Sequence, residues 1–389
     1  MKTVAVIFGG KSTEHDVSII TAIASIIKPL ELTKKYKVLP VYITKDGSWY
    51  SDDKFADVAT YQSDEVENLL RKLPKLKLLF DDGLKLVKNG KKLGRSEVVD
   101  VDVVFTAMHG THGEDGELMG LLEMANVPYV GCDMPSSVLA MDKVLSKAIV
   151  SAAKIETPKF VHFRKHHYEE NSDKFIKKVN DHLQYPLFVK PAHLGSSIGI
   201  TKVDKPEDLA NAIEVALHFD DRALVEEAVN NLLEVTLPIM GNENPTPALL
   251  EQPLLDSKDF FDFEKKYLGN GKKGGKKMGG KQGAQGYSKI PADVSKDLYD
   301  KAVNLALDVY AVIGCSGIAR IDMLIDSKES VVYFNEINPL PGSLYAHNWN
   351  KAGVSNVELV DKLVQLAEAR WQEKQKLSTG FDTSFLKQF

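Results

Sequence analysis

The first third of the chain alternates short apolar runs with helix-length segments, and this alternation constrains the fold more than any other feature. The apolar run at residues 4–8 ends at Gly9 and Gly10, as a buried strand followed by a turn does. The further expected elements are a helix capped by Ser12 and Thr13 that ends near Ile27, strands at 38–43 and 101–107, and a helix at 118–125. Strands that alternate with helices predict an open, mostly parallel α/β sheet.

Length and composition are those of an ordinary globular protein. The 389 residues exceed what one hydrophobic core usually organises, which predicts two or three domains. The net charge of −5 gives no reason to expect nucleic acid or an anionic membrane as a partner, and no apolar stretch reads as a signal peptide or a membrane span. Cys132 and Cys315 stand far apart without a metal-ligand spacing, which argues against a disulfide framework and favours a reducing, cytoplasmic location.

Changes in pattern divide the chain into three expected units, residues 1–134, 135–228 and 229–389. Within the first unit, the more polar residues 46–98 lack clear periodicity and are expected to decorate the sheet. The other expected elements are a helix at 137–153, strands at 160–163, 187–190, 224–227 and 235–240, and helices at 296–312 and 357–370. An apolar stripe on the helix at 296–312, which includes Leu298 and Val312, is expected to pack in the core.

Two strand-like stretches in the last quarter of the chain carry the strongest chemical signal. Side chains two apart on a strand share a face, so Arg320 lies beside Asp322, and Glu336 lies beside Asn338. A polar turn between the stretches predicts a hairpin that brings the two carboxylates and the amide together. Such hard oxygen ligands suit Mg²⁺ rather than zinc and leave positions for phosphate oxygens. The alternative is a solvated hairpin with scattered charges. The apolar residues between the charged ones argue against it, because they are expected to pack in the core.

A second group of residues favours phosphate binding. Lys190 ends an expected strand, and the small-residue loop that includes Ser196 and Ser197 follows it. Backbone N–H groups and hydroxyls of such a loop can approach phosphate oxygens, while lysine adds a point charge. A glycine-serine loop is more often a plain turn, and Lys143 alone would be a surface charge. The chain has no GxxxxGK[ST] motif, which argues against a P-loop ATPase.

Two further segments are open to more than one interpretation. The glycine-rich loop at 109–116 contains two histidines and two acids, but the ligand set around Asp322 suits a metal better, so substrate contact or loop ordering is expected there. Glu14, at the start of the first helix, fits either a ligand contact or a helix-terminus charge.

The Gly/Lys-rich segment at 269–286 has no apolar periodicity and is expected to be a mobile loop, as many active-site lids are. Its GxGxxG match at 269–274 lacks the strand and helix that a dinucleotide site requires.

In their joint order these segments resemble the D-alanine–D-alanine ligases of the ATP-grasp superfamily, and the resemblance covers nearly the whole chain. Each segment is weak alone, and their common order argues against chance. The matching segments are 8–10 with 14–18, 109–116, 141–143, 189–191 with 195–199, 261–264 with 266–267, 320–322, and 335–339 with 341–342.

The resemblance implies a three-domain ATP-grasp fold with ATP between the second and third units. It implies that the carboxylate of one D-alanine attacks the γ-phosphate of ATP, and that the amine of a second D-alanine then displaces phosphate from the acyl phosphate. The product, D-alanyl-D-alanine, feeds peptidoglycan synthesis. Homodimers are common in this family, whereas no pattern in the chain marks an interface.

The resemblance also implies a role for each matching residue. Catalytic roles fall to Glu14, Ser196, Tyr267 and Arg320, and substrate contacts to His109, Gly342 and His347. ATP contacts fall to Lys143, Lys190, Ser197, Glu226, Ala228, Val229, Glu234 and Lys266, within reach of a lid at 260–290. The metal ligands are Asp322, Glu336 and Asn338, which would hold two Mg²⁺ ions, with Mn²⁺ as the alternative metal.

Departures from the family pattern keep alternatives open. Leu232 and Leu233 replace a usual Gly-Arg pair before Glu234, and His347 stands near the place of a serine that helps to bind the second substrate's carboxylate. Tyr267 resembles the form associated with D-alanine, but a D-alanine–D-lactate or D-alanine–D-serine ligase remains an alternative. A non-catalytic ATP- or metabolite-binding protein and an NAD(P)-dependent oxidoreductase are the alternatives from other classes.

Overall fold

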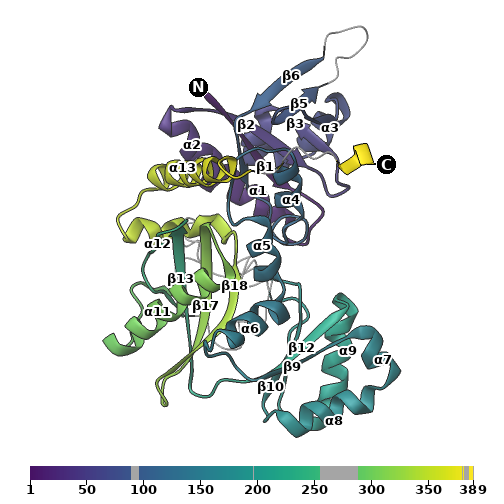
Figure 1. The fold of residues 1–389 in the computed structure, drawn as a ribbon, viewed down its shortest axis with the longest axis vertical. Coiled ribbons are helices and arrows are strands. Elements are labelled where there is room, and N and C mark those ends of the chain that lie inside the picture. Colours follow the sequence, from purple (N-terminus) through teal and green to yellow (C-terminus); the bar gives the residue numbers. More distant parts are fainter. Residues whose placement is uncertain (89–95, 196, 255–287, 379, 381–384, 389) are drawn as a thin grey trace, which may run out of the picture.

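The computed structural model describes residues 1–88, 96–195, 197–254, 288–378, 380 and 385–388, and its larger sheets follow one another along the chain (Figure 1). A mostly parallel five-stranded sheet comes first, and two antiparallel four-stranded sheets follow it. This is the mixed α/β architecture that the sequence predicts.

The first sheet has the order β3-β2-β1-β7-β8. Strand β1 runs parallel to β2 and β7, and β3 alone is antiparallel to its neighbour. The burial of β1 on both faces explains its continuous apolar run. The strands are β1 (Lys2–Gly9), β2 (Tyr36–Ile43), β3 (Trp49–Ser51), β7 (Val103–Thr106) and β8 (Tyr129–Val130), with helix α4 (Glu117–Met124) between the last two.

The first helical segment is longer than predicted, and its cap is different. It runs through α1 (His15–Ile20), the π-helical η1 (Thr21–Ile27) and α2 (Lys28–Thr33). Its N-cap residue is Glu14, whose backbone N–H donates to Ser12 Oγ, so Ser12 and Thr13 do not cap it as expected. The segment continues past Ile27 because Leu30 extends its buried face.

Residues 46–98 carry more regular structure than the sequence predicts. They contain α3 (Glu65–Lys72), the 3₁₀ turns η2 (Asp53–Ala56) and η3 (Val58–Tyr61), and most of a small antiparallel sheet. That sheet consists of β4 (Leu76–Phe80), β5 (Leu84–Lys88) and β6 (Glu97–Val101). Its strands expose many side chains, which explains the weak periodicity of the sequence there.

The central sheet has the order β11-β10-β12-β9 and is antiparallel throughout. Helices α8 and α9 cover one face with residues such as Val179 and Ile213. The elements are β9 (Phe160–Arg164), α7 (Lys165–Glu170), α8 (Ser172–His182), β10 (Leu187–Pro191), β11 (Thr201–Val203), η4 (Pro206–Asp208), α9 (Leu209–Phe219) and β12 (Arg222–Glu227).

The third sheet has the order β14-β13-β17-β18, with α11 packed on it. Leu298 is buried in this core as predicted, whereas Val312 is 39% exposed. The elements are β13 (Leu232–Gly241), β14 (Thr246–Pro247), α11 (Lys296–Ile313), β17 (Gly317–Asp326), β18 (Val331–Asn338), η6 (Gly342–Tyr345) and α12 (Ala346–Lys351), beside the short pair β15 (Gln252–Pro253) and β16 (Ser288–Lys289).

The helix expected at 137–153 is two helices, α5 (Met134–Met141) and α6 (Lys143–Ala152). Asp142 separates them because its backbone is extended and its Oδ1 accepts the N–H groups of Val144 and Leu145 at 2.9 and 3.0 Å. A new helix therefore begins at Lys143, which places that lysine at a helix N-terminus.

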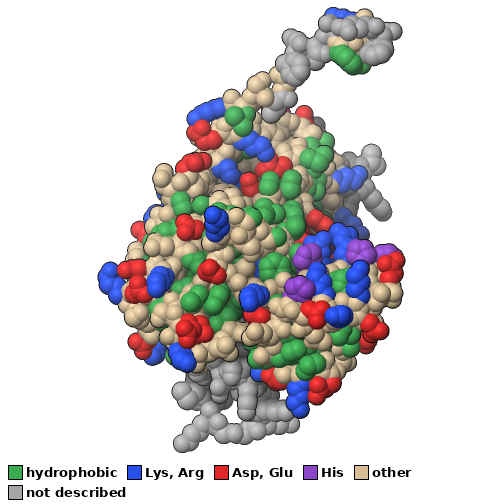
Figure 2. All heavy atoms as spheres, turned by 60° about the horizontal axis from the view of Figure 1, so that its bottom comes forward, with side chains coloured by type: hydrophobic (Ala, Val, Ile, Leu, Met, Phe, Trp, Pro, Cys, Tyr) green, Lys and Arg blue, Asp and Glu red, His purple; other side chains and the backbone are tan. Residues whose placement is uncertain are grey.

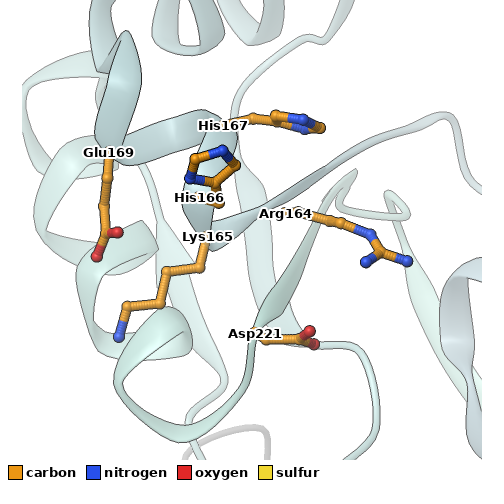
Figure 3. A pocket seen from close by; sticks show the side chains of 6 residues that line it. All are labelled: Arg164, Lys165, His166, His167, Glu169 and Asp221. Atoms are coloured by element: carbon orange, nitrogen blue, oxygen red, sulfur yellow. The ribbon is translucent and has the colours of Figure 1, made fainter.

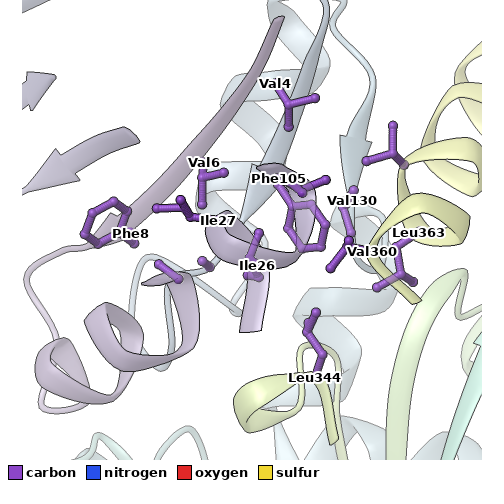
Figure 4. Close-up of a cluster of buried hydrophobic side chains, with 14 of the residues drawn as sticks. Val4, Val6, Phe8, Ile26, Ile27, Phe105, Val130, Leu344, Val360 and Leu363 are labelled. Carbon is purple, nitrogen blue, oxygen red and sulfur yellow. The ribbon is translucent and has the colours of Figure 1, made fainter. Parts of the chain in front are cut away.

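The last long helix, α13 (Asn356–Gln375), returns to the first sheet. Its residues Val360 and Leu363 share one hydrophobic cluster with Val6, Phe105 and Leu344 (Figure 4). The helix thus joins the start of the chain to the segment that follows β18. The chain closes with the 3₁₀ turn η7 (Phe385–Gln388).

No helix in the described part of the chain combines the length and the apolar composition needed to cross a membrane.

Candidate active site

The hairpin of β17 and β18 brings its four polar residues together, as the sequence predicts. Asp322 lies opposite Glu336, and Arg320 lies opposite Asn338. The Arg320 guanidinium donates two hydrogen bonds of 2.6 Å to the Asp322 carboxylate, and Asn338 Nδ2 donates to Asp322 Oδ2 at 3.0 Å. A bulge after Asp322 interrupts the register where these groups meet.

A buried carboxylate holds two lysines beside this hairpin. Glu226 Oε1 lies 2.5 Å from Lys190 Nζ, and Oε2 lies 2.9 Å from Lys147 Nζ. Burial opposes ionisation of Glu226, but the two lysine charges outweigh it and lower the pKa of the carboxyl to about 2. Lys190 also donates to Asn335 Oδ1 at 3.2 Å, which links the central sheet to β18.

Lys143 is the second link between the central sheet and the hairpin. Its Nζ donates to the carbonyl of Leu194 at 2.6 Å and lies 3.5 Å from Glu336 Oε2. Its backbone N–H donates to the carbonyl of Ala192. The loop after β10 is therefore attached to the start of α6, and the Lys143 ammonium lies between that loop and the acidic hairpin.

The predicted substrate residues of the first unit lie near Arg320 of the hairpin, whose charge acts on His109. His109 Nε2 lies 3.0 Å from Thr21 Oγ1, and His109 Nδ1 lies 3.6 Å from Glu114 Oε2. Burial disfavours protonation of His109, but the hydrogen bond and charge of Glu114, followed by the charge of Glu14, raise its pKa. The Glu14 carboxylate lies close to the loop at 109–116 and to the loop after β10. A Cβ added at Gly110 or at Gly195 would lie 2.9 or 3.5 Å, respectively, from Glu14 Oε2.

The turn after β18 contributes an aromatic and histidine cluster. Ser343, Leu344 and Tyr345 all have positive φ angles of 51–54°, which non-glycine residues rarely adopt in succession. Tyr345 lies under the Arg320 guanidinium, 5.0 Å from ring centre to Cζ. His347 Nε2 lies 2.9 Å from Oε2 of the buried Glu251, so this histidine is held by a charged partner near Arg320.

Comparisons with known proteins show what the whole chain is similar to. Residues 3–132 match the family model described as D-ala D-ala ligase N-terminus, and residues 149–365 match D-ala D-ala ligase C-terminus. A D-alanine–D-alanine ligase of Clostridium acetobutylicum is 34% identical over 95% of this chain and 98% of its own length. This chain belongs to the D-alanine–D-alanine ligase family. It therefore has the ATP-grasp fold of that family.

Two solved structures of related ligases resemble the chain over nearly its full length. The D-alanine–D-alanine ligase of Coxiella burnetii superposes with a TM-score of 0.77 at 27% identity and covers 96% of both chains. The VanG D-Ala:D-Ser ligase of Enterococcus faecalis superposes with a TM-score of 0.74 at 32% identity, covering 94% of this chain and 99% of its own. Ligases named for two different second substrates thus share this fold.

The remaining residues predicted from the ligase family are distributed as follows. Glu234 lies on β13 two residues before Thr236, and Thr236 pairs with Asp322. Glu234 therefore lies on the same face of the third sheet as Asp322. Ala228 and Val229 connect the central and third sheets. Ser197 has a φ of 61° in the loop after β10, and Gly342 opens the turn η6. Ser196, Lys266, Tyr267 and most of the lid predicted at 260–290 lie outside the described residues.

Sequence reasoning missed several residues that contact the predicted site residues. Lys147 follows Lys143 by one helical turn, a spacing that could have indicated a shared direction. Thr21, Glu251 and Tyr345 gave no signal, because their partners lie in distant segments. Glu226 was predicted near adenine, and that contact stays a prediction, since its carboxylate is engaged by two lysines.

A separate groove of about 570 Å³ lies on the central unit of this ligase-family chain. Figure 2 shows lysine, arginine and histidine side chains gathered on part of that face, and Figure 3 shows Arg164, Lys165, His166 and His167 around the groove. None of the predicted site residues lines it. These side chains are mostly exposed, and His166 pairs with Glu170 at 3.2 Å, so a hydrated charged face accounts for them.

Proposed function

We propose that this protein is an ATP-dependent ligase that joins two D-alanine molecules into D-alanyl-D-alanine, a precursor of peptidoglycan. Family membership supports the reaction class. The observation that carries the proposal is the contact of two lysines with the acidic hairpin: Lys143 lies 3.5 Å from Glu336, and Lys190 bonds to the neighbouring Asn335. Phosphoryl transfer needs positioned cations beside metal-holding carboxylates.

The donor set of the hairpin fits a hard divalent cation. Asp322, Glu336 and Asn338 supply only oxygen ligands, and they come from adjoining strands with a shared register. We propose that these residues hold two Mg²⁺ ions, with Mn²⁺ as a substitute. When bound, the ions would neutralise charge on the β- and γ-phosphates of ATP. Lys143, Lys190 and the Ser197 loop would bind phosphate oxygens, with Glu234, Ala228 and Val229 toward the nucleoside.

Each reacting group has a counterpart in the chain. Glu14 would bind the ammonium of the first D-alanine, with His109 beside the carboxylate of that substrate. That carboxylate attacks the γ-phosphorus, and ADP leaves. Arg320 would stabilise the negative charge that develops when the second amine attacks the acyl phosphate. Asp322 and Tyr345 hold the guanidinium in place for this step, because they contact it from two sides.

The second substrate would bind beside His347. His347 lies near Arg320 and is held by Glu251, so an imidazole stands close to where a second substrate's carboxylate would lie. D-alanine is the substrate we propose, and D-serine or D-lactate are the alternatives. The similarity to a D-Ala:D-Ser ligase at 32% identity is the reason to test D-serine directly.

We propose that the enzyme acts in the cytoplasm. Two buried cysteines in the free thiol form are compatible with a cytoplasmic enzyme. We propose a homodimer in line with the family, which light scattering after size exclusion would check.

The decisive experiment is mass spectrometry of products after incubation with ATP, Mg²⁺ and equal amounts of D-alanine, D-serine and D-lactate. We expect D-alanyl-D-alanine to dominate, and its formation to stop when a chelator removes Mg²⁺ and resume when Mg²⁺ is restored. A mixed dipeptide or depsipeptide would keep the chemistry and change the second substrate. The absence of any condensed product, with Arg320→Met as the inactive reference, would favour a non-catalytic ATP-binding protein.

A further inference from the structure

His193 lies at the centre of a charged cluster to which the roles above assign nothing. Its Nε2 lies 3.3 Å from Asp142 Oδ2, and its Nδ1 lies 2.9 Å from Asp220 Oδ1. Both carboxylates are buried, with side chains 7% and 6% exposed. Arg222 donates to Asp142 Oδ2 at 2.8 Å, and Asp221 is the other acid near the imidazole.

Only the protonated form of His193 satisfies both carboxylates, because only then does each ring nitrogen carry a hydrogen. The hydrogen bonds with Asp142 and Asp220 raise the pKa of His193 to about 9. The imidazole is therefore charged at neutral pH, with Asp142, Asp220 and Asp221 opposing it and Arg222 sharing one of its partners.

Three consecutive residues of the loop after β10 are attached to one corner of α6. The carbonyl of Ala192 accepts the backbone N–H of Lys143 at 3.0 Å, and the carbonyl of Leu194 accepts its Nζ at 2.6 Å. Between them, His193 bonds to Asp142, the residue that caps α6. The same imidazole pairs with Asp220, the C-cap residue of α9, and the backbone N–H of His193 donates to this carboxylate too, so the loop is held from two sides.

We propose that His193 is a positioning residue for ATP binding: it holds the loop after β10 against the start of α6 and so fixes the Lys143 ammonium beside Glu336. The proposal deepens the ATP-dependent function above and rests on it. Without the imidazolium, Asp142 and Asp220 repel each other, and both carbonyls that orient Lys143 lose their anchor. His193 itself is directed at the two acids and contacts no reacting group.

The test compares wild type with His193→Gln, which is neutral, and His193→Arg, which keeps a charge and two or more donors. His166→Gln is the matched control, since His166 is an exposed histidine of the same unit. We expect His193→Gln to raise KM for ATP about tenfold and to leave KM for D-alanine within about twofold, because a charge-assisted hydrogen-bond network is lost only at the nucleotide. His193→Arg should restore the wild-type value, and His166→Gln should match wild type.

The pH profile separates positioning from a purely structural role. In wild type, KM for ATP should rise as the pH passes through about 9, where His193 loses its proton. The rise should be absent in His193→Gln, whose KM is high throughout, and shifted beyond pH 10 in His193→Arg. A His193→Gln enzyme that melts at a lower temperature but keeps the wild-type KM for ATP and its alkaline rise would overturn the proposal.

Calorimetric titration with Mg·ADP keeps this test independent of the reaction. If wild type formed no dipeptide but bound Mg·ADP tightly, the proposed function would fail while the variants still tested His193. An equal affinity of wild type and His193→Gln for Mg·ADP would refute the positioning role alone.

Discussion

One buried carboxylate, Glu226 on β12, pairs with two lysines, Lys190 on β10 and Lys147 on α6, and this two-to-one ratio determines how single substitutions there behave. Glu226→Gln removes the carboxylate that bonds to both Lys147 and Lys190, and removing one partner of a buried ion pair costs about 3–5 kcal/mol. Lys147→Met leaves the Lys190–Glu226 pair intact, so it should cost less. Denaturant unfolding of the variants measures the order, and an equal loss for both would contradict this account.

The same carboxyl predicts a response to acid. Its pKa is about 2 in the folded protein and 4.5 when unperturbed, so the folded state favours the ionised form. The stability it contributes is present above pH 4.5 and is lost as the pH falls through 2. We expect the difference in unfolding free energy between wild type and Glu226→Gln to shrink between pH 4.5 and 2. A difference that stays constant over this range would show that folding does not lower the pKa of this carboxyl.

At the scale of elements, the π-helical turn η1 joins two segments that are proposed to bind substrate. Thr21 Oγ1 lies 3.0 Å from His109 Nε2 and accepts the backbone N–H of Ser343 at 3.1 Å. π-Helical turns are rare and often occur at functional sites. The single hydroxyl therefore connects the glycine-rich loop of the first unit with the strained turn after β18.

Thr21→Val keeps the shape of this side chain and removes the hydroxyl. The half-buried N–H of Ser343 then loses its acceptor, which costs at most about 1–3 kcal/mol. We expect KM for D-alanine to rise about tenfold in steady-state kinetics, with a smaller change in KM for ATP. Thr21→Ser keeps the hydroxyl and serves as the control. The same kinetics for both variants would show that the hydroxyl does not position the substrate loops.

At the scale of the whole molecule, α13 ties the end of the chain to its beginning. Leu363 is fully buried against the first sheet, and Lys35 and Tyr36 both contact Asp361 of this helix. Arg370 donates to the carbonyls of Gly131 and Tyr129 and to Ser316 Oγ, so it holds segments of the first and third units together. Opening of the first sheet should therefore depend on α13.

Leu363→Ala tests this dependence, because a cavity at a buried leucine costs about 2–5 kcal/mol. We expect hydrogen exchange of the β1 amides to accelerate by a corresponding amount, although β1 and Leu363 are far apart in the sequence. Val312→Ala, at a 39% exposed helix position, should leave exchange nearly unchanged. Faster exchange confined to α13 would mean that the first sheet is stable without it.

The sequence by itself determined the features that depend on local periodicity. The two-residue repeat of a strand placed Arg320 beside Asp322 and Glu336 beside Asn338, and a polar turn made the hairpin that joins them. The alternation of apolar runs and helices predicted the parallel first sheet. The order of several weak motifs indicated the ligase family, because short segments that contact a nucleotide keep their chemistry even when the surrounding sequence changes.

Only the tertiary structure decided which distant groups become partners. Nothing in the sequence distinguishes Lys147 from other helical lysines. It is the tertiary structure that buries this side chain and pairs it with the carboxylate of Glu226. Thr21 and Ser343 meet across more than 300 residues, and His193 meets Asp142 across a gap of 51. Such contacts depend on how finished elements pack, and packing is set by side-chain volume and burial over the whole chain rather than by any local pattern.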